Sequence, residues 1–156
     1  MNQKTLAPIL IIIVILGAIL YFFYPFSKDT PSPLTVAETL PAQKEGKIVV
    51  SSPLPNSTLS VSPVIIKGKA VGNWFFEASA PVDIVNWDGL IIGQGFVKVD
   101  AGYDWMTTAM VPFTGTISYD ASQLGPYKYG WIIMKKDNPS GESQFDDSLE
   151  FKILFP

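Results

Sequence analysis

A single uninterrupted apolar run, residues 6–26, constrains this chain more than any other feature of its sequence. Its 21 residues carry no charge, and an α-helix of that length rises roughly 30 Å, the thickness of a bilayer's hydrocarbon core. The run ends in the bulky sequence YFFYPF, where a signal peptidase would need small side chains and where aromatic rings suit the headgroup boundary. We therefore predict an uncleaved transmembrane anchor, with a buried helix of a soluble protein as the alternative.

The segments on either side of this run predict its orientation. Lys4 precedes the run, whereas one lysine and one aspartate cancel just after it, so the positive-inside tendency places residues 1–5 in the cytoplasm. Residues 27–47 contain three prolines with scattered serine, threonine and charge, which indicates a semi-stiff spacer. Residues 48–156 are then expected to form one domain on the outer side of the cytoplasmic (inner) membrane.

The composition excludes several classes of function. Residues 48–156 contain 7 lysines against 11 aspartates and glutamates, and the chain has no arginine, so the clustered cations of a nucleic-acid-binding surface are missing. The chain also has no histidine and no cysteine. This excludes Ser–His and Cys–His nucleophiles, thiolate zinc sites and disulfides. Any catalysis would have to use carboxylates, lysine, tyrosine or serine.

From residue 48 onward, short runs rich in β-branched and aromatic residues alternate with turn residues, which is typical of an all-β sandwich. Asp88-Gly89 predicts a type I′ hairpin, and two glycines in the following strand predict a bulge or a close backbone approach. No helical period of useful length follows residue 26. We predict a two-sheet antiparallel immunoglobulin-like sandwich of about seven or eight strands. The predicted strands are residues 48–50, 64–71, 74–80, 82–87, 90–99, 111–118, 129–135 and 149–155.

Several short motifs together resemble the immunoglobulin-like domain of bacterial spore germination proteins. They are SSPLPN at 51–56, KGKA followed by VGNWFFEA at 67–78, DWM at 104–106, VPF at 111–113, KDNPSG at 136–141 and DD at 146–147. The resemblance covers residues 48–156. It implies a bacterial envelope protein whose sandwich domain is displayed outside the cytoplasmic membrane, and domains like it are not known as enzymes.

The candidate binding residues fall in three segments that we expect the fold to bring together. A loop tryptophan beside an acid can stack on a sugar ring while the carboxylate binds hydroxyls, and a carboxylate among apolar neighbours is costly to desolvate unless it is paired. Trp74 and Trp131 are also expected in the core, and Trp87 is expected to pack over one end of the sandwich. The candidates are Asn73, Trp74, Glu77, Asp104, Trp105, Asp137 and Asn138.

Two alternatives use the acidic residues differently. Asp137, Asp146 and Asp147 crowd one loop and could hold calcium in an adhesion module, although the spacing fits no EF-hand. Glu77 with Asp104 or with Asp137 could form the carboxylate pair of a small glycoside hydrolase. Our main prediction is a non-catalytic binding or scaffolding module without a cofactor, anchored in the membrane, that recognises an envelope protein or peptidoglycan.

Overall fold

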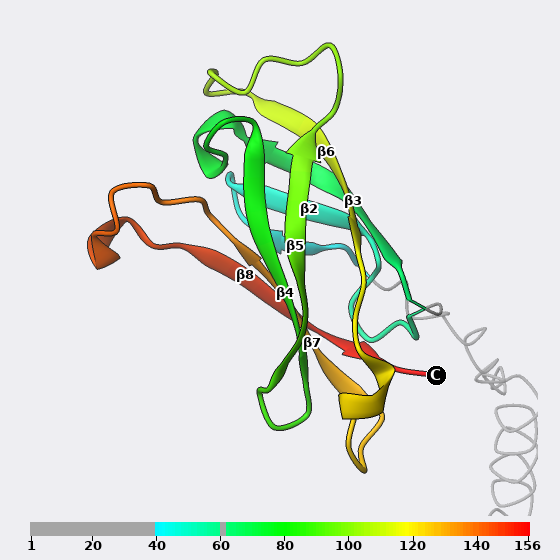
Figure 1. The fold of residues 1–156 in the computed structure, drawn as a ribbon. Helices are drawn as coiled ribbons and strands as arrows, with labels where there is room; N and C mark the ends of the chain where they lie inside the picture. Colours follow the sequence, from blue (N-terminus) through cyan, green and yellow to red (C-terminus); the bar gives the residue numbers. More distant parts are fainter. Residues whose placement is uncertain (1–39, 60–61) are drawn as a thin grey trace, which may run out of the picture. The chain divides into compact units, whose positions relative to one another are not determined.

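The computed structural model describes residues 40–59 and 62–156, which form an antiparallel sheet of eight strands in the order β1-β2-β3-β6-β5-β4-β7-β8 (Figure 1). The all-β, immunoglobulin-like prediction is confirmed. Within the described residues the only helical elements are three 3₁₀ turns, η1 (Gly72–Trp74), η2 (Ala121–Gln123) and η3 (Ser143–Phe145). The strands are β1 (Ala42–Lys44), β2 (Ile48–Ser52), β3 (Val64–Val71), β4 (Ser79–Asn86), β5 (Ile91–Val99), β6 (Met110–Ile117), β7 (Tyr129–Lys135) and β8 (Ser148–Leu154).

The two layers of the sandwich belong to one continuous hydrogen-bonded sheet. Strand β5 pairs with β4 over most of its length but meets β6 only at residues 97–99, so β5 joins the layers at one corner. The layer β1-β2-β3-β6 thereby folds over the layer β5-β4-β7-β8. As a result β1 lies near β8, and Lys44 and Lys47 form ion pairs with Asp147 there. The core lies between the two layers.

Alternation along the strands fills this core. In β3 the inward positions Val64, Ile66 and Ala70 are buried, whereas Lys67 and Lys69 are exposed, as the period of two requires. The outward residues of β7 are only half-buried, because that face lies on the surface of the sandwich. The largest fully buried side chains are Trp74, Phe113, Ile48, Ile66, Ile84, Ile117, Ile132, Met134 and Ile153.

The outer edge of β8 is covered by residues 56–59. The backbone N–H of Asn56 donates to the Lys152 carbonyl at 2.7 Å, and the N–H of Leu59 donates to the Leu154 carbonyl at 2.8 Å. The Leu154 N–H donates in turn to Ser57 at 2.9 Å. An edge strand with unpaired backbone groups can pair with a strand of another chain, and residues 56–59 cover about half of the outer edge of β8.

The predicted strand at 74–80 is wrong. Trp74 ends the 3₁₀ turn η1, and a tight turn with mutual backbone hydrogen bonds of 3.0 Å between Phe76 and Ser79 follows it. Strand β4 starts only at Ser79 and continues through Pro81, which the sequence had suggested as a strand end. Pro81 has no N–H to donate, but β4 pairs with β7 only from Val82 onward. At Pro81 the strand therefore has a partner, β5, on one side only, and the proline is tolerated.

The hairpin between β4 and β5 is present but has a three-residue loop instead of the predicted type I′ turn. The N–H of Asn86 donates to the Leu90 carbonyl at 3.0 Å, and only Gly89 has a positive φ, of 86°. Trp87 therefore stands in the loop rather than at the end of the strand. The predicted close approach at Gly93 is confirmed, because a Cβ there would lie 2.6 Å from the Ser118 carbonyl oxygen.

The N-terminal predictions fall largely outside the described residues. Residues 1–5, the predicted membrane segment 6–26 and most of the predicted spacer 27–47 are not among them. Within 40–59 and 62–156, no helix has the length and apolarity needed to cross a bilayer. Strand β1 lies inside the predicted spacer and pairs with β2, so the sheet begins earlier in the chain than the sequence indicated.

Candidate binding surfaces

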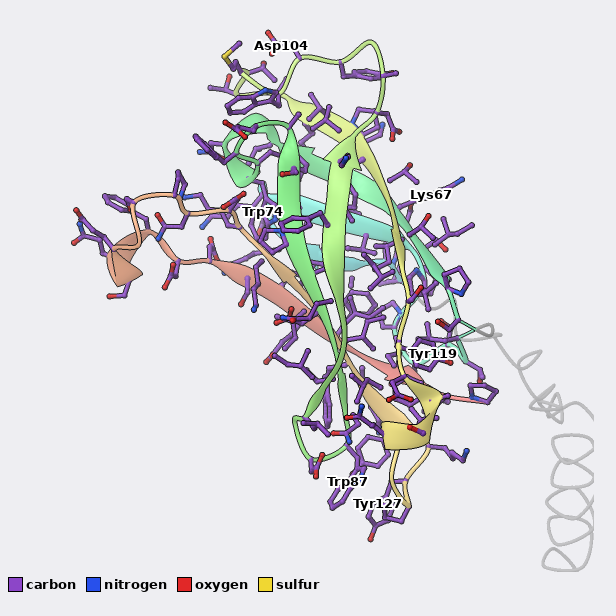
Figure 2. All side chains as sticks on the ribbon, viewed as in Figure 1. Lys67, Trp74, Trp87, Asp104, Tyr119 and Tyr127 are labelled. Atoms are coloured by element: carbon purple, nitrogen blue, oxygen red, sulfur yellow. The ribbon has the colours of Figure 1, made fainter. Side chains whose placement is uncertain are left out.

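The three predicted segments do lie against one another. The N–H of Asp137 donates to the Trp74 carbonyl at 3.0 Å, and a Cβ on Gly72 would come within 2.0 Å of the Trp105 carbonyl oxygen. The Phe76 and Trp105 rings meet edge to face with centroids 6.3 Å apart. Figure 2 shows Asp104 and Trp74 on the same side of the fold, away from Trp87. That these segments bind a ligand stays a prediction.

Trp74 lies under this surface. Its side chain is only 1% exposed and lies in the core, which confirms the core prediction, and the residue also lines a hollow together with Asn73. Its indole Nε1 is the one buried side-chain polar atom without a hydrogen-bond partner among the described residues. Trp105 is half-buried against the core, whereas the nearby rings of Phe76 and Tyr103 are exposed.

The acids proposed for hydrolysis lack the setting of a catalytic pair. Glu77 occupies an exposed turn, and Asp104 lies in an exposed loop where its Oδ1 accepts the Met106 N–H at 2.9 Å. The two hollows beside these segments are lined by other acids, Asp146 and Asp147. The two carboxylates of a glycoside hydrolase face one cleft, and neither hollow is lined by Glu77, Asp104 or Asp137.

The polar loop between β7 and β8 makes many hydrogen bonds within itself. Asn138 Nδ2 donates to the Glu142 carbonyl and to Asp146 Oδ1, both at 2.8 Å. Asp147 is engaged by Lys44 and by Lys47, the latter at 2.6 Å. No group of three or more metal-ligating side chains occurs in 40–59 and 62–156. Asp137, Asp146 and Asp147 therefore do not form one cluster of ligands in the described residues, and calcium binding at this loop stays a prediction.

Asp147 ties the first strand to the last. Partial desolvation alone would raise the pKa of its carboxyl, but hydrogen bonds and charge from Lys44 and Lys47 outweigh it and lower the pKa to about 2. Beside this carboxylate lies a hollow of about 530 Å³, which we call the lysine hollow. It is lined by Lys44, Ile133, Lys135, Lys136, Asp146, Asp147 and Ser148.

A row of four aromatic rings occupies the outer face of β7 and the adjoining loops, and we call it the aromatic row. It consists of Trp87, Tyr127, Tyr129 and Trp131, with successive ring centroids 4.9, 6.0 and 5.6 Å apart. Figure 2 shows Trp87 and Tyr127 at the end of the fold opposite Asp104. Trp131 is thus half-buried on the outer face, and its predicted place in the core is wrong.

The row is accessible and carries positive charge. Tyr127 is 52% exposed, and the other three rings are partly exposed. Lys152 on β8 places its Nζ 4.4 Å from the centroid of the Tyr129 ring, a cation–π contact. Rings with an apolar face and a polar edge are favoured at binding surfaces, because they bury a large area and still make hydrogen bonds.

The fold holds the row in place from two sides. Asn86 is 3% exposed; its Nδ2 donates to the Gln123 carbonyl at 2.7 Å and its Oδ1 accepts the Leu90 N–H at 3.0 Å, which links the β4–β5 hairpin to the η2 loop. The η2 loop is also held by hydrogen bonds that Ser122 and Gln123 donate to the Asp120 carboxylate, and these bonds lower the pKa of that group. A preorganised surface loses little entropy when it binds.

The sequence contains a pattern that indicates this row, but our prediction of the binding residues did not include it. Tyr127, Tyr129 and Trp131 recur at every second position, which places them on one face of a strand. The buried face of β7, with Ile132 and Met134, is equally apolar, so the pattern alone could not say which side faced water. Trp87 joins the row only because the hairpin loop is longer than predicted.

The strand order and the two-layer core define an immunoglobulin-like domain. Residues 47–142 match the family model described as the immunoglobulin-like domain of bacterial spore germination (Gmad2), and the chain belongs to this family of non-enzymatic domains. The match ends before β8, whereas the resemblance in the sequence was expected to reach residue 156. No curated protein and no solved structure matches the chain.

Proposed function

We propose that this protein is a non-catalytic binding module of the bacterial cell envelope, anchored by residues 6–26 in the cytoplasmic membrane with its domain on the outer side. We propose further that the domain recognises cell-wall glycan through the aromatic row. The anchor is supported by 21 uncharged residues in succession. The family supports a binding role without chemistry.

The observation that carries the glycan proposal is the row itself. Two rings on the outer face of β7 and two in the adjoining loops lie in succession, and all four are at least partly exposed. Pyranose rings present C–H faces that pack on aromatic rings, and their hydroxyls bind flanking polar groups. Lys152, which lies opposite Trp131 and over the Tyr129 ring, supplies such a group.

A protein partner is the second candidate, favoured by exposed apolar side chains at the opposite end. Tyr103 is 58% exposed, Met106 74% and Phe76 41%. Residues of this kind often contact other proteins. Binding by strand addition has less support, because residues 56–59 cover half of β8 and the other edge strand, β1, has only three residues.

Sedimentation of the full-length protein with purified peptidoglycan tests the glycan proposal. We expect Tyr127→Ala to weaken binding about three- to tenfold, since one aromatic contact contributes about 0.5–1.5 kcal/mol. Tyr103→Ala is the matched control, because Tyr103 is a similarly exposed tyrosine at the other end of the domain.

Two results would overturn the assignment. If the wild-type protein does not sediment with peptidoglycan, the glycan proposal fails. If Tyr103→Ala weakens binding and Tyr127→Ala does not, the binding surface lies at the opposite end. The tryptophan emission spectrum of each variant confirms that it is folded, since all four tryptophans lie in the described domain.

A further inference from the structure

The face that carries the aromatic row continues beyond Trp131. Because side chains alternate along a strand, Ile133 and Lys135 point to the same side of β7 as Tyr129 and Trp131. Ile133 and Lys135 also line the lysine hollow. The distance along the strand from Trp131 to Lys135 is about 13 Å. The row and the hollow are therefore two parts of one outer track.

Cations outnumber acids in the lining of this hollow. Lys44, Lys135 and Lys136 face two carboxylates, Asp146 and Asp147. Lys135 is also paired with Asp83, a carboxylate 3% exposed on the neighbouring strand that accepts a second hydrogen bond from Gln94 at 3.0 Å.

Of the three lysines that line the hollow, Lys136 is the one without an ion-pair partner among the described residues. Its Nζ donates to the Phe145 carbonyl at 3.3 Å, and no carboxylate lies within ion-pair distance of it among the described residues. Asp147 is shared between Lys44 and Lys47, and Asp146 accepts its hydrogen bond from Asn138. The ammonium of Lys136 is thus available to an external anion.

We propose that the aromatic row and the lysine hollow form one elongated site for an anionic glycan. Sugar rings would pack on the row, and a carboxylate or phosphate carried by the same polymer would be held by Lys136. This inference rests on the proposed function. An ammonium binds either anion through charge-assisted hydrogen bonds, so the shared chemistry of the ligand is a negatively charged group along a sugar chain.

One residue on the track opposes such a ligand. Glu150 on β8 is exposed and lies directly opposite Ile133, between the row and the hollow. Its carboxylate repels an anionic polymer that spans both parts. Removing its charge must therefore strengthen binding of the anionic ligand. A variant that had merely lost structure would bind more weakly instead.

The test measures the affinity of the full-length protein for three polymers in detergent solution. They are a neutral N-acetylglucosamine oligomer, a peptidoglycan glycan strand with muramic acid carboxylates, and a glycerol-phosphate polymer that carries sugar substituents. We expect Lys136→Gln to weaken binding of at least one anionic polymer roughly three- to tenfold and to leave the neutral oligomer unchanged. Glu150→Gln should tighten binding of the same anionic polymer.

Lys69→Gln is the matched control, because Lys69 is an exposed lysine on β3 in the opposite layer. The anionic polymer that responds to Lys136→Gln identifies the carboxylate or the phosphate as the natural group. Equal effects of Lys136→Gln and Lys69→Gln on the anionic polymers would overturn the elongated site.

The outcomes separate this inference from the proposed function. If Tyr127→Ala weakens binding of all three polymers while Lys136→Gln changes none, glycan binding stands and the elongated site falls. If Tyr127→Ala changes no affinity, the aromatic row is not a glycan site, and both proposals fall together.

Discussion

At the scale of single residues, the least expected feature is the turn that joins Phe76 to Ser79. Glu77 and Ala78 have φ values of 49° and 59°, the left-handed conformation that both central residues of a type I′ turn adopt. Asparagine and glycine are usual there, because a Cβ in this region meets the following carbonyl. The strain is held by the two hydrogen bonds between Phe76 and Ser79 and by the packing of Phe75 against Phe113.

Replacing Ala78 by glycine should therefore stabilise the domain. We expect the free energy of unfolding to rise by about 1 kcal/mol, the usual cost of a left-handed residue that carries a Cβ. Urea unfolding followed by tryptophan fluorescence measures the change. Ala101→Gly is the control: Ala101 is exposed and has no positive φ, so glycine there should give no gain. An equal rise for both variants would contradict the explanation.

At the scale of the elements, the sequence predicted best where one face alone is apolar. The bounds of β3 match the predicted strand at 64–71, because lysines mark its outer face. β7 was also placed at its observed bounds, but its orientation was ambiguous, and Trp131 was assigned to the wrong side. The failure at 74–80 has a different cause. Neither Phe76 nor Glu77 is a residue type that favours a left-handed turn. The alternation of polar and apolar residues therefore predicted a strand where the chain forms a turn.

The strand β1 depends on charge more than on length. It has three residues, and Lys44 and Lys47 at its end hold it near β8 through Asp147. Lys44 also donates to the Ser148 carbonyl at 3.3 Å. A strand this short makes few hydrogen bonds with β2, so the ion pairs with Asp147 add to its attachment. The same contact forms one wall of the lysine hollow.

This contact makes the stability depend on pH in a defined window. The folded pKa of Asp147 is about 2, below its ordinary value of 3.8, so the stabilisation is present above about pH 4 and is lost as the pH falls toward 2. Asp147→Asn should lower the free energy of unfolding at pH 7 by on the order of 1 kcal/mol, because water screens the half-exposed lysines.

The difference between wild type and Asp147→Asn should shrink as the pH falls to about 2, when the wild-type carboxyl is protonated as well. Urea midpoints at both pH values measure it. Glu45→Gln is the control, since Glu45 is exposed in the same β1–β2 turn and makes no ion pair within the described residues. A gap for Asp147→Asn that stays constant between pH 7 and pH 2 would contradict the role given to the lysines.

At the scale of the whole molecule, the sequence predicted the class of the domain but not the aromatic row. Short alternating runs and turn residues were enough to indicate an immunoglobulin-like fold. The predicted surface gathered acids and tryptophans from three loops, yet Trp74 is in the core and Asp147 is neutralised by lysines. The aromatic row depends on which face of a layer is exposed, which only the assembled sandwich determines.

The proposed orientation of the whole chain yields a final prediction. If residues 6–26 span the cytoplasmic membrane with residues 1–5 inside, a cysteine in the domain must react with a membrane-impermeant maleimide on intact spheroplasts. The chain has no cysteine, so each introduced thiol reports alone. Gln144→Cys is an exposed domain position and should label at once, whereas Asn2→Cys should label only after permeabilisation. The reverse pattern would place the domain in the cytoplasm, away from any wall glycan, and labelled protein released by a high-salt wash would show that the apolar run does not anchor it.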